Sequence, residues 1–113
     1  MSRHEDEVRL VHMLDHAMEA VEMCSRRSKA DLNSERMLNL ALVRLVEIVG
    51  EVANRVSKTG QEARPDIPWR QIIGMRNRIV HGYDEVDFDI LWTVIHQDLP
   101  LLIVQLKATL GKD

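Results

Sequence analysis

One short stretch of the chain, residues 76–83, concentrates side chains that can act on a phosphate-bearing ligand. Arg76 offers a planar guanidinium whose donors match phosphate oxygens, and Asn77 follows it directly. His81 lies five residues after the arginine and carries an imidazole, the group that exchanges protons near neutral pH. Tyr83 adds a hydroxyl two residues later. These side chains predict a site that binds an anion and moves protons.

The element that must position this stretch is a helix predicted from Pro68 to residue 80 or 81, ending near Gly82. At ~100° per residue its apolar residues form one broad face, and Arg76 projects from the centre of that face. Two further arginines, Arg70 and Arg78, fall on the opposite side. They are the weaker candidates for contact with a phosphate backbone.

An arginine directed into an apolar face is costly unless it is paired, because its guanidinium cannot lose its charge. One interpretation is a structural ion pair, for which Asp98 in the last helix is a possible partner. The other interpretation is that the face lines a cleft in which Arg76, Asn77, His81 and Tyr83 converge on a ligand. The spacing alone leaves both interpretations open.

The remaining pattern predicts helices over about residues 5–25, 34–56 and 87–110, separated by polar loops over residues 25–34 and 57–68. Asn33 or Ser34 is the expected N-cap of the second helix. Pro100 lies inside the last helix and must kink or restart it. No stretch alternates with period two. We therefore expect an all-α fold, an antiparallel up-down bundle of four or five helices, in a single domain over residues 1–113.

The second helix is apolar around much of its circumference, which is typical of a helix buried on two sides. Leu40, Val43 and Val46 lie outside its main apolar face, and we expect them to form a homodimer interface. Gly50, in the middle of this helix, indicates close packing of a neighbouring helix or subunit.

Composition narrows the possible partners and location. The net charge of −3 argues against a protein that coats nucleic acid with a basic surface. Residues 52–83 nevertheless carry six basic and two acidic groups, a net +4, which suits a small phosphate-bearing target. No apolar run approaches the ~20 residues of a membrane span, and the single Cys24 cannot form an internal disulfide. We expect a cytoplasmic protein without membrane association.

The segment containing these residues also resembles a known family. The hallmark of HepT-like toxins, within the HEPN superfamily, is similar to GMRNRIVHGYDEVD at residues 74–87, with an arginine, four intervening residues and a histidine. The optional asparagine after the arginine and the tyrosine two residues after the histidine are both present. Three other segments resemble the family: EIVGEVANRVS at residues 47–57, IPWRQIIG at 67–74 and VDFDILWTVIHQDLPLLIVQL at 86–106.

The resemblance implies a helical-bundle homodimer, a toxin of a toxin–antitoxin pair, whose paired motifs line a cleft and cleave RNA without a metal or other cofactor. Arg76, Asn77 and His81 would be catalytic or substrate-binding. The implied partner is an MNT-type nucleotidyltransferase antitoxin, which transfers AMP to Tyr83 and so blocks the RNA site. Such cleavage uses the 2′-OH of RNA as the nucleophile, which requires a base, an acid and positive donors. Because each chain supplies one such histidine, a two-fold dimer supplies the second.

Two alternatives to the enzyme are a non-catalytic HEPN subunit that partners a nucleotidyltransferase and a purely structural dimerisation bundle. An arginine and a histidine in the motif favour the enzyme, since a scaffold gains nothing from them. His12 and His16 stand four apart on the first helix, a spacing that can bind a metal. They lie opposite the apolar face without an evident third ligand, so we expect no metal site there.

Overall fold

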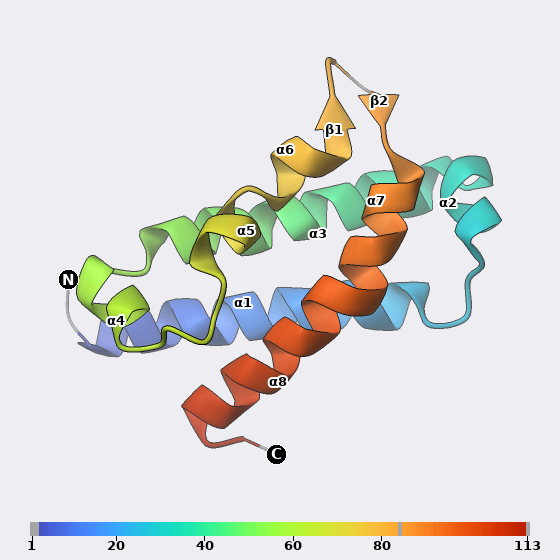
Figure 1. Ribbon diagram of the computed structural model, residues 1–113. Coiled ribbons are helices and arrows are strands. Elements are labelled where there is room, and N and C mark those ends of the chain that lie inside the picture. Colours follow the sequence, from blue (N-terminus) through green and yellow to red (C-terminus); the bar gives the residue numbers. More distant parts are fainter. Residues whose placement is uncertain (1–2, 84, 113) are drawn as a thin grey trace.

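The computed structural model describes residues 3–83 and 85–112. Its centre is an antiparallel pair of long helices, α1 (Arg3–Cys24) and α3 (Arg36–Arg55), which lie side by side (Figure 1). A C-terminal helical run crosses the pair, formed by α7 (Phe88–Thr93), the π-helical turn η1 (Val94–Asp98) and α8 (Leu99–Leu110). The predicted all-α bundle is confirmed.

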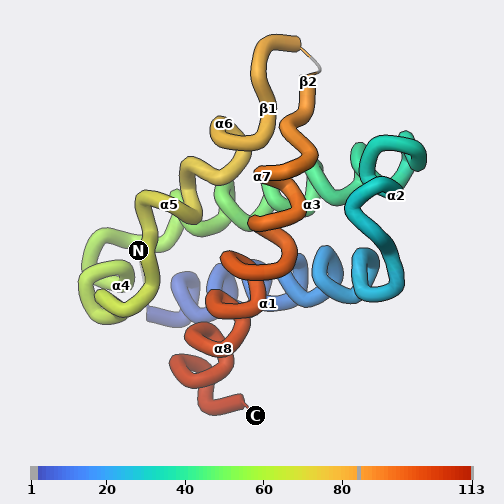
Figure 2. The backbone as a smooth tube through the Cα atoms, turned by 45° about the vertical axis from the view of Figure 1, so that its right-hand side comes forward, coloured from blue at the N-terminus to red at the C-terminus, as the bar shows by residue number. Residues whose placement is uncertain are grey.

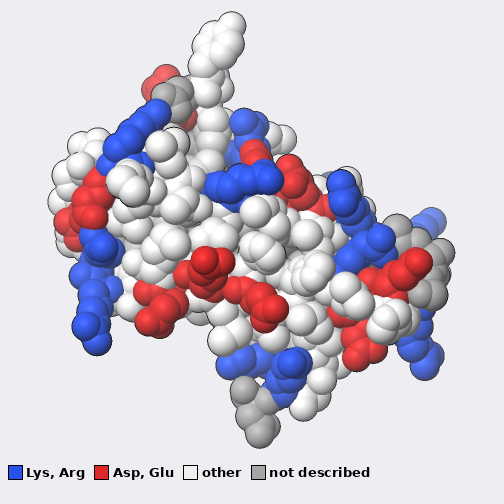
Figure 3. Space-filling model, turned by 180° about the vertical axis from the view of Figure 1, so that it is seen from behind, with Lys and Arg blue, Asp and Glu red and all other residues white. Residues whose placement is uncertain are grey.

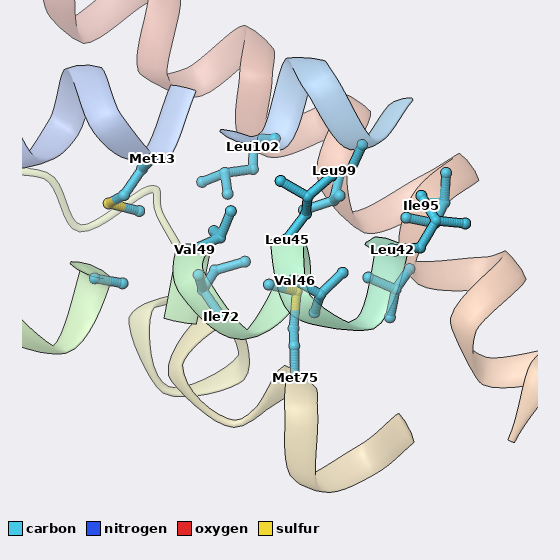
Figure 4. Packing of buried hydrophobic residues seen from close by; sticks show 14 of the residues in the cluster. Met13, Leu42, Leu45, Val46, Val49, Ile72, Met75, Ile95, Leu99 and Leu102 are labelled. Atoms are coloured by element: carbon cyan, nitrogen blue, oxygen red, sulfur yellow. The ribbon is translucent and has the colours of Figure 1, made fainter. Parts of the chain in front are cut away.

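Helix α3 is buried on two sides, as its sequence predicts, but both sides are covered within one chain. Leu99 and Leu102 of α8 lie on one side of it, and Met75 of α6 points toward Val46 on another (Figure 4). Val46 is fully buried, so its assignment to a subunit interface was wrong. The short helix α6 (Met75–Ile79) covers Val46 instead of a second subunit. Val43 is partly buried against the core, whereas Leu40 remains 48% exposed.

Both predicted loops contain a short helix. Residues 25–34 include α2 (Lys29–Ser34), which starts where the Asp31 carboxylate accepts a hydrogen bond from the Ser28 backbone N–H at 2.7 Å. Residues 57–68 include α4 (Lys58–Glu62), whose first turn is capped by the Ser57 hydroxyl, which accepts from the Gly60 N–H at 3.0 Å. Local capping thus forms helices too short to show an apolar period.

The expected N-cap of the second helix was also wrong. Asn33 and Ser34 belong to α2, and Glu35 occupies the N-cap position of α3 without a capping side-chain hydrogen bond. The buried Asn39 ties the two helices together, because its amide donates to the Leu32 carbonyl at 2.8 Å. The junction is therefore held by a contact from inside α3 rather than by a cap.

The helix predicted over residues 68–81 is broken in the middle. It consists of α5 (Trp69–Ile73) and α6 (Met75–Ile79), separated by Gly74 with φ −90° and ψ 2°. These dihedrals lie outside the helical range, and glycine is among the poorest helix formers. The interruption rotates the side chains of α6 away from the positions that a continuous helix would give them.

A small antiparallel hairpin follows α6, with β1 (Val80–His81) paired to β2 (Glu85–Val86). The register sets Val80 opposite Val86, and both valines pack partly against the core. Strands of two residues are too short to show alternation in a sequence, so the hairpin was not predicted. It projects away from the helices in both backbone views (Figure 1, Figure 2).

The C-terminal run is a helix that restarts, as Pro100 requires. Asp87 caps α7, because its side chain accepts a hydrogen bond from the Ile90 N–H at 3.0 Å. The π-helical turn η1 then lets α8 begin at Leu99, with Pro100 in the first turn, where its missing N–H is tolerated. Gly111 closes α8 with φ +69°, a left-handed conformation that suits glycine.

Gly50 lies where α3 packs closely against a neighbouring helix. A side chain at Gly50 would place its Cβ 3.1 Å and 3.2 Å from the carbonyl oxygens of Ile72 and Ile73, so the predicted close packing is confirmed and the neighbour is α5. Among the residues that the structure describes, no helix is both long and apolar enough to cross a membrane.

Candidate active site

The candidate site is carried by α6 and the hairpin that follows it. Met75 and Ile79 are fully buried and anchor this segment to the core. They lie one helical turn apart, so the intervening Arg76, Asn77 and Arg78 are all exposed. In a single turn of helix, the residues at positions i and i+4 lie on the same side. Met75 and Ile79 therefore face the core together, and the three residues between them face the solvent.

Arg76 does not enter the core, contrary to the prediction from a continuous helix. Its side chain is 47% exposed, and its Nε donates to Oε2 of Glu47 on α3 at 2.9 Å. The break at Gly74 is the physical reason, because it changes the direction in which α6 presents its residues. The ion-pair interpretation holds in a modified form, because Arg76 is paired on the surface and with Glu47 rather than Asp98. The cleft interpretation changes as well, because Arg76 does not project from an apolar face.

Glu47 is the residue of this neighbourhood that the sequence reasoning missed. Its carboxylate also accepts from the Arg44 guanidinium, three residues earlier on α3, so it lies between two arginines. Arg44 in addition lies 3.8 Å from the Glu51 carboxylate. The available signal was a charged residue inside the apolar run of residues 45–49, although nothing in the spacing indicates which arginine it meets.

Asp98 pairs with the other arginine of the motif. Its Oδ2 accepts from Arg78 at 3.1 Å, with the Arg78 side chain 43% exposed. Asp98 is the last residue of the π-helical turn η1, which places the carboxylate against α6. Arg70 is exposed on α5, the preceding helix. Arg76 and Arg78 therefore pair with carboxylates of different elements, α3 and η1, while Arg70 lies on α5.

His81 lies on β1, directly opposite Glu85 in the hairpin register, and it is exposed. The turn begins at Gly82, whose φ of +70° is a left-handed conformation that glycine adopts at little cost. His81 was expected at the end of a helix, so the hairpin moves its imidazole onto a different backbone geometry. The exposed position leaves the ring accessible to a large ligand.

Tyr83 lies in the turn of the hairpin and is fully exposed. A helix that stops at Gly82 would leave the Tyr83 ring anchored beside the site, with the hydroxyl more accessible than the ring; the structure contradicts this expectation. The turn carries Tyr83 beyond the packed surface, so both the ring and the hydroxyl meet solvent. A full exposure of this kind is unusual for a large aromatic residue.

One chain does not bring the candidate residues into direct contact. Among the residues that the structure describes, no hydrogen bond or ion pair joins the side chains of Arg76, Asn77 and His81 to one another. They are close in the chain, on the consecutive elements α6 and β1. The surface seen from behind mixes acidic and basic side chains without a broad basic field (Figure 3), in agreement with the low net charge.

The other candidate residues have structural explanations. His16 Nδ1 lies 2.7 Å from the His12 carbonyl oxygen of its own helix. In the described part of the chain, no cluster of three or more His, Cys, Asp or Glu side chains could hold a metal ion. His96 is exposed and stacks on Trp92 with 3.8 Å between ring centroids. Cys24 is buried, and burial raises the pKa of its thiol, as expected of a core cysteine.

Comparison with known proteins agrees with the motif. The family described as "Ribonuclease HepT-like" matches residues 13–109. The chain is 33% identical over 104 residues to "Putative RNase TTE0752" of Caldanaerobacter subterraneus subsp. tengcongensis, covering 88% of this chain and 93% of that protein.

Two other relatives carry similar names. "Putative RNase MJ1380" of Methanocaldococcus jannaschii is 27% identical over 100 residues, 88% of this chain and 92% of that protein. "Probable ribonuclease HepT" of Thermococcus cleftensis is 29% identical over 93 residues, 79% and 84% of the two chains. No solved structure gives a significant match. The chain therefore belongs to the HepT-like ribonuclease family, and it is an endoribonuclease.

Proposed function

We propose that this ribonuclease cleaves RNA at a site formed by Arg76, Asn77 and His81, by a reaction that needs no metal. The observation that carries the proposal is the arrangement of α6, where two buried residues fix the segment and every residue between them is exposed. The two buried residues fix the backbone of this turn, so the polar side chains start from a preorganised position, as electrostatic catalysis requires.

The residue types supply the parts of such a reaction. The 2′-OH of RNA loses its proton to a base and its oxygen attacks the adjacent phosphorus. The bond to the 5′-oxygen breaks, and an acid returns a proton to that leaving group. A 2′,3′-cyclic phosphate and a 5′-hydroxyl result. His81 serves as base or acid, Arg76 stabilises the charge developing on the phosphate oxygens, and Asn77 orients either group. Arg70 and Arg78 bind the flanking backbone.

The active form in this proposal is a homodimer, because one histidine cannot act as base and acid at the same moment. Exposed apolar residues on α3 support an interface there: Met37 is 87% exposed and Leu40 is 48% exposed. They lie on the same helix as Glu47, the partner of Arg76. An interface at this end of α3 would bring two copies of α6 and its hairpin onto one composite surface.

The proposed regulation acts on Tyr83. An MNT-type nucleotidyltransferase antitoxin would transfer AMP to its hydroxyl, which the complete exposure of the residue makes accessible. The attached phosphodiester is negative, lies close in sequence to Arg76 and His81, and would exclude an RNA backbone by charge and size. In this scheme the chain is the toxin of a toxin–antitoxin pair.

The test is incubation of the purified, unmodified protein with total RNA in the presence of EDTA. We expect a defined cleavage pattern that disappears in His81→Ala. If the protein binds RNA or a nucleotidyltransferase but leaves RNA intact under these conditions, the alternative of a non-catalytic partner subunit replaces this proposal.

A further inference from the structure

The ion pair between Arg76 and Glu47 uses only one of the guanidinium nitrogens of Arg76. Glu47 accepts from Nε of Arg76 at 2.9 Å, which is the nitrogen nearest the side-chain stem. The two terminal amino groups of Arg76 have no hydrogen-bond partner among the residues that the structure describes. A guanidinium binds phosphate most strongly through paired donors on one edge. Glu47 thus occupies one donor of Arg76 and leaves the terminal amino groups available.

Glu47 is itself held in place on a rigid element. It is 26% exposed, on the middle of α3, between the buried Val46 and Val49. Its other carboxylate oxygen, Oε1, pairs with the guanidinium of Arg44. The close approach of α3 to α5 at Gly50 holds the two elements together, since the chain leaves no room there for a side chain. The backbone of α3 therefore holds the Glu47 carboxylate beside the Arg76 guanidinium.

We infer that Glu47 is a positioning residue, which holds the Arg76 guanidinium so that its terminal amino groups face a substrate phosphate. This inference rests on the proposed RNA site. The competing explanation is that Glu47 merely neutralises Arg76 and competes with phosphate for it. The two explanations predict opposite changes in the rate of RNA cleavage when Glu47 is replaced. If Glu47 only competes, removing its charge speeds cleavage, whereas if Glu47 positions Arg76, removing the acceptor slows it.

The kinetic test compares Glu47→Ala, Glu47→Gln and Glu51→Ala on one RNA substrate. Glu51 is the matched control, because it is an acidic residue one turn further along α3 that contacts Arg44 but not Arg76. We expect Glu47→Ala to lower kcat about 10- to 100-fold, the effect of misplacing a reacting group by about 1 Å, with KM unchanged or lower. Glu47→Gln retains an acceptor oxygen and should restore most of kcat, and Glu51→Ala should match wild type.

A measurement independent of catalysis addresses the contact itself. The Arg76 Nε–H resonance, followed by ¹H–¹⁵N NMR and assigned with Arg76→Lys, should be protected from solvent exchange in wild type and Glu47→Gln. It should be lost to exchange in Glu47→Ala. An unchanged Arg76 resonance in Glu47→Ala overturns the inference even if the protein proves inactive on RNA.

The kinetic outcomes separate the two claims. If wild type cleaves RNA and Arg76→Ala does not, the proposed site stands, and equal or faster cleavage by Glu47→Ala then overturns only the positioning role. If Arg76→Ala cleaves as well as wild type, the proposed site itself fails. Loss of kcat in Glu47→Ala with recovery in Glu47→Gln, at unchanged thermal midpoints, supports the positioning role.

Discussion

Replacing Arg76 by alanine should separate catalysis from folding. In the structure the side chain is half-exposed and its ion pair with Glu47 lies at the surface. Arg44 continues to pair with Glu47 after the change, so no buried charge is left without a partner. Loss of one exposed ion pair costs about 0–1 kcal/mol of unfolding free energy. For a chain of this size that lowers the thermal midpoint by at most about 4 °C.

The rate should respond far more strongly than the stability. Removing a preorganised donor from a developing negative charge typically lowers kcat about 10²- to 10³-fold. Arg78→Ala is a matched control, since Arg78 has a similar exposure and the same kind of carboxylate partner, Asp98. Its stability should fall by the same small amount, while kcat should stay near wild type and KM should rise through the weaker contact with the RNA backbone.

The assay combines initial rates on RNA in EDTA with differential scanning calorimetry of wild type, Arg76→Ala and Arg78→Ala. A loss of about 3–5 kcal/mol in Arg76→Ala, with residual activity tracking the folded fraction, would show that the arginine is a buried structural group. Equal kinetic effects of the two substitutions would show that Arg76 contributes only backbone affinity. Either result refutes the reasoning.

Three further predictions follow from other contacts. Asp6→Ala removes the acceptor of the Ser57 N–H and of the Ser57 hydroxyl proton, and it should lower the unfolding free energy by about 1–3 kcal/mol in urea titrations at pH 7. Hydrogen bonds from Ser57 hold the pKa of Asp6 below its usual 3.8, so the unfolded chain binds this proton more readily than the folded chain. The difference in unfolding free energy between wild type and Asp6→Ala should therefore shrink as pH falls through the folded pKa of Asp6. A difference that does not depend on pH would contradict this role of Asp6. Tyr83→Phe should cleave RNA like wild type but gain no AMP in intact mass spectra after co-expression with the nucleotidyltransferase; a mass gain that persists assigns the modification elsewhere. Leu40→Glu together with Met37→Glu places charges on the proposed interface and should give an inactive monomer in sedimentation, so an active dimer would locate the interface elsewhere.

The long elements were predictable because they repeat an apolar period over many turns. Residues 3–24 and 36–55 form helices within two residues of the predicted limits. The restart at Pro100 was predictable for a different reason, since proline imposes a local constraint that no packing can remove. In both cases the determining information is contained in the segment itself.

The local geometry of the site depended on information that the sequence pattern does not carry. Gly74 fits a continuous helix by spacing, and only packing of α5 and α6 against α3 shows that the chain bends there. That bend decides that Arg76 meets Glu47 and that Arg78 meets Asp98. The residues of the motif could be chosen from their chemistry, but their ion-pair partners depend on tertiary contacts.

The assignment of Val46 to a subunit interface was wrong for a related reason. Amphipathic analysis identifies how much of α3 is apolar but not which element covers it. Val46 is covered by Met75 of α6 (Figure 4), whereas Met37, which lies on no predicted apolar face, is the more exposed residue. The apolar period of a long helix does not indicate which short elements pack on it.

The most direct test of the central claim is cleavage of an RNA in which the nucleotide before the scissile bond carries 2′-deoxyribose. We expect the natural RNA to be cleaved in EDTA to products ending in a 2′,3′-cyclic phosphate and a 5′-hydroxyl, and the deoxy-substituted RNA to stay uncleaved at that position. We also expect His81→Ala to leave both substrates intact. Cleavage of the deoxy-substituted RNA at the same bond, or natural products ending in a 5′-phosphate, would contradict the proposed chemistry.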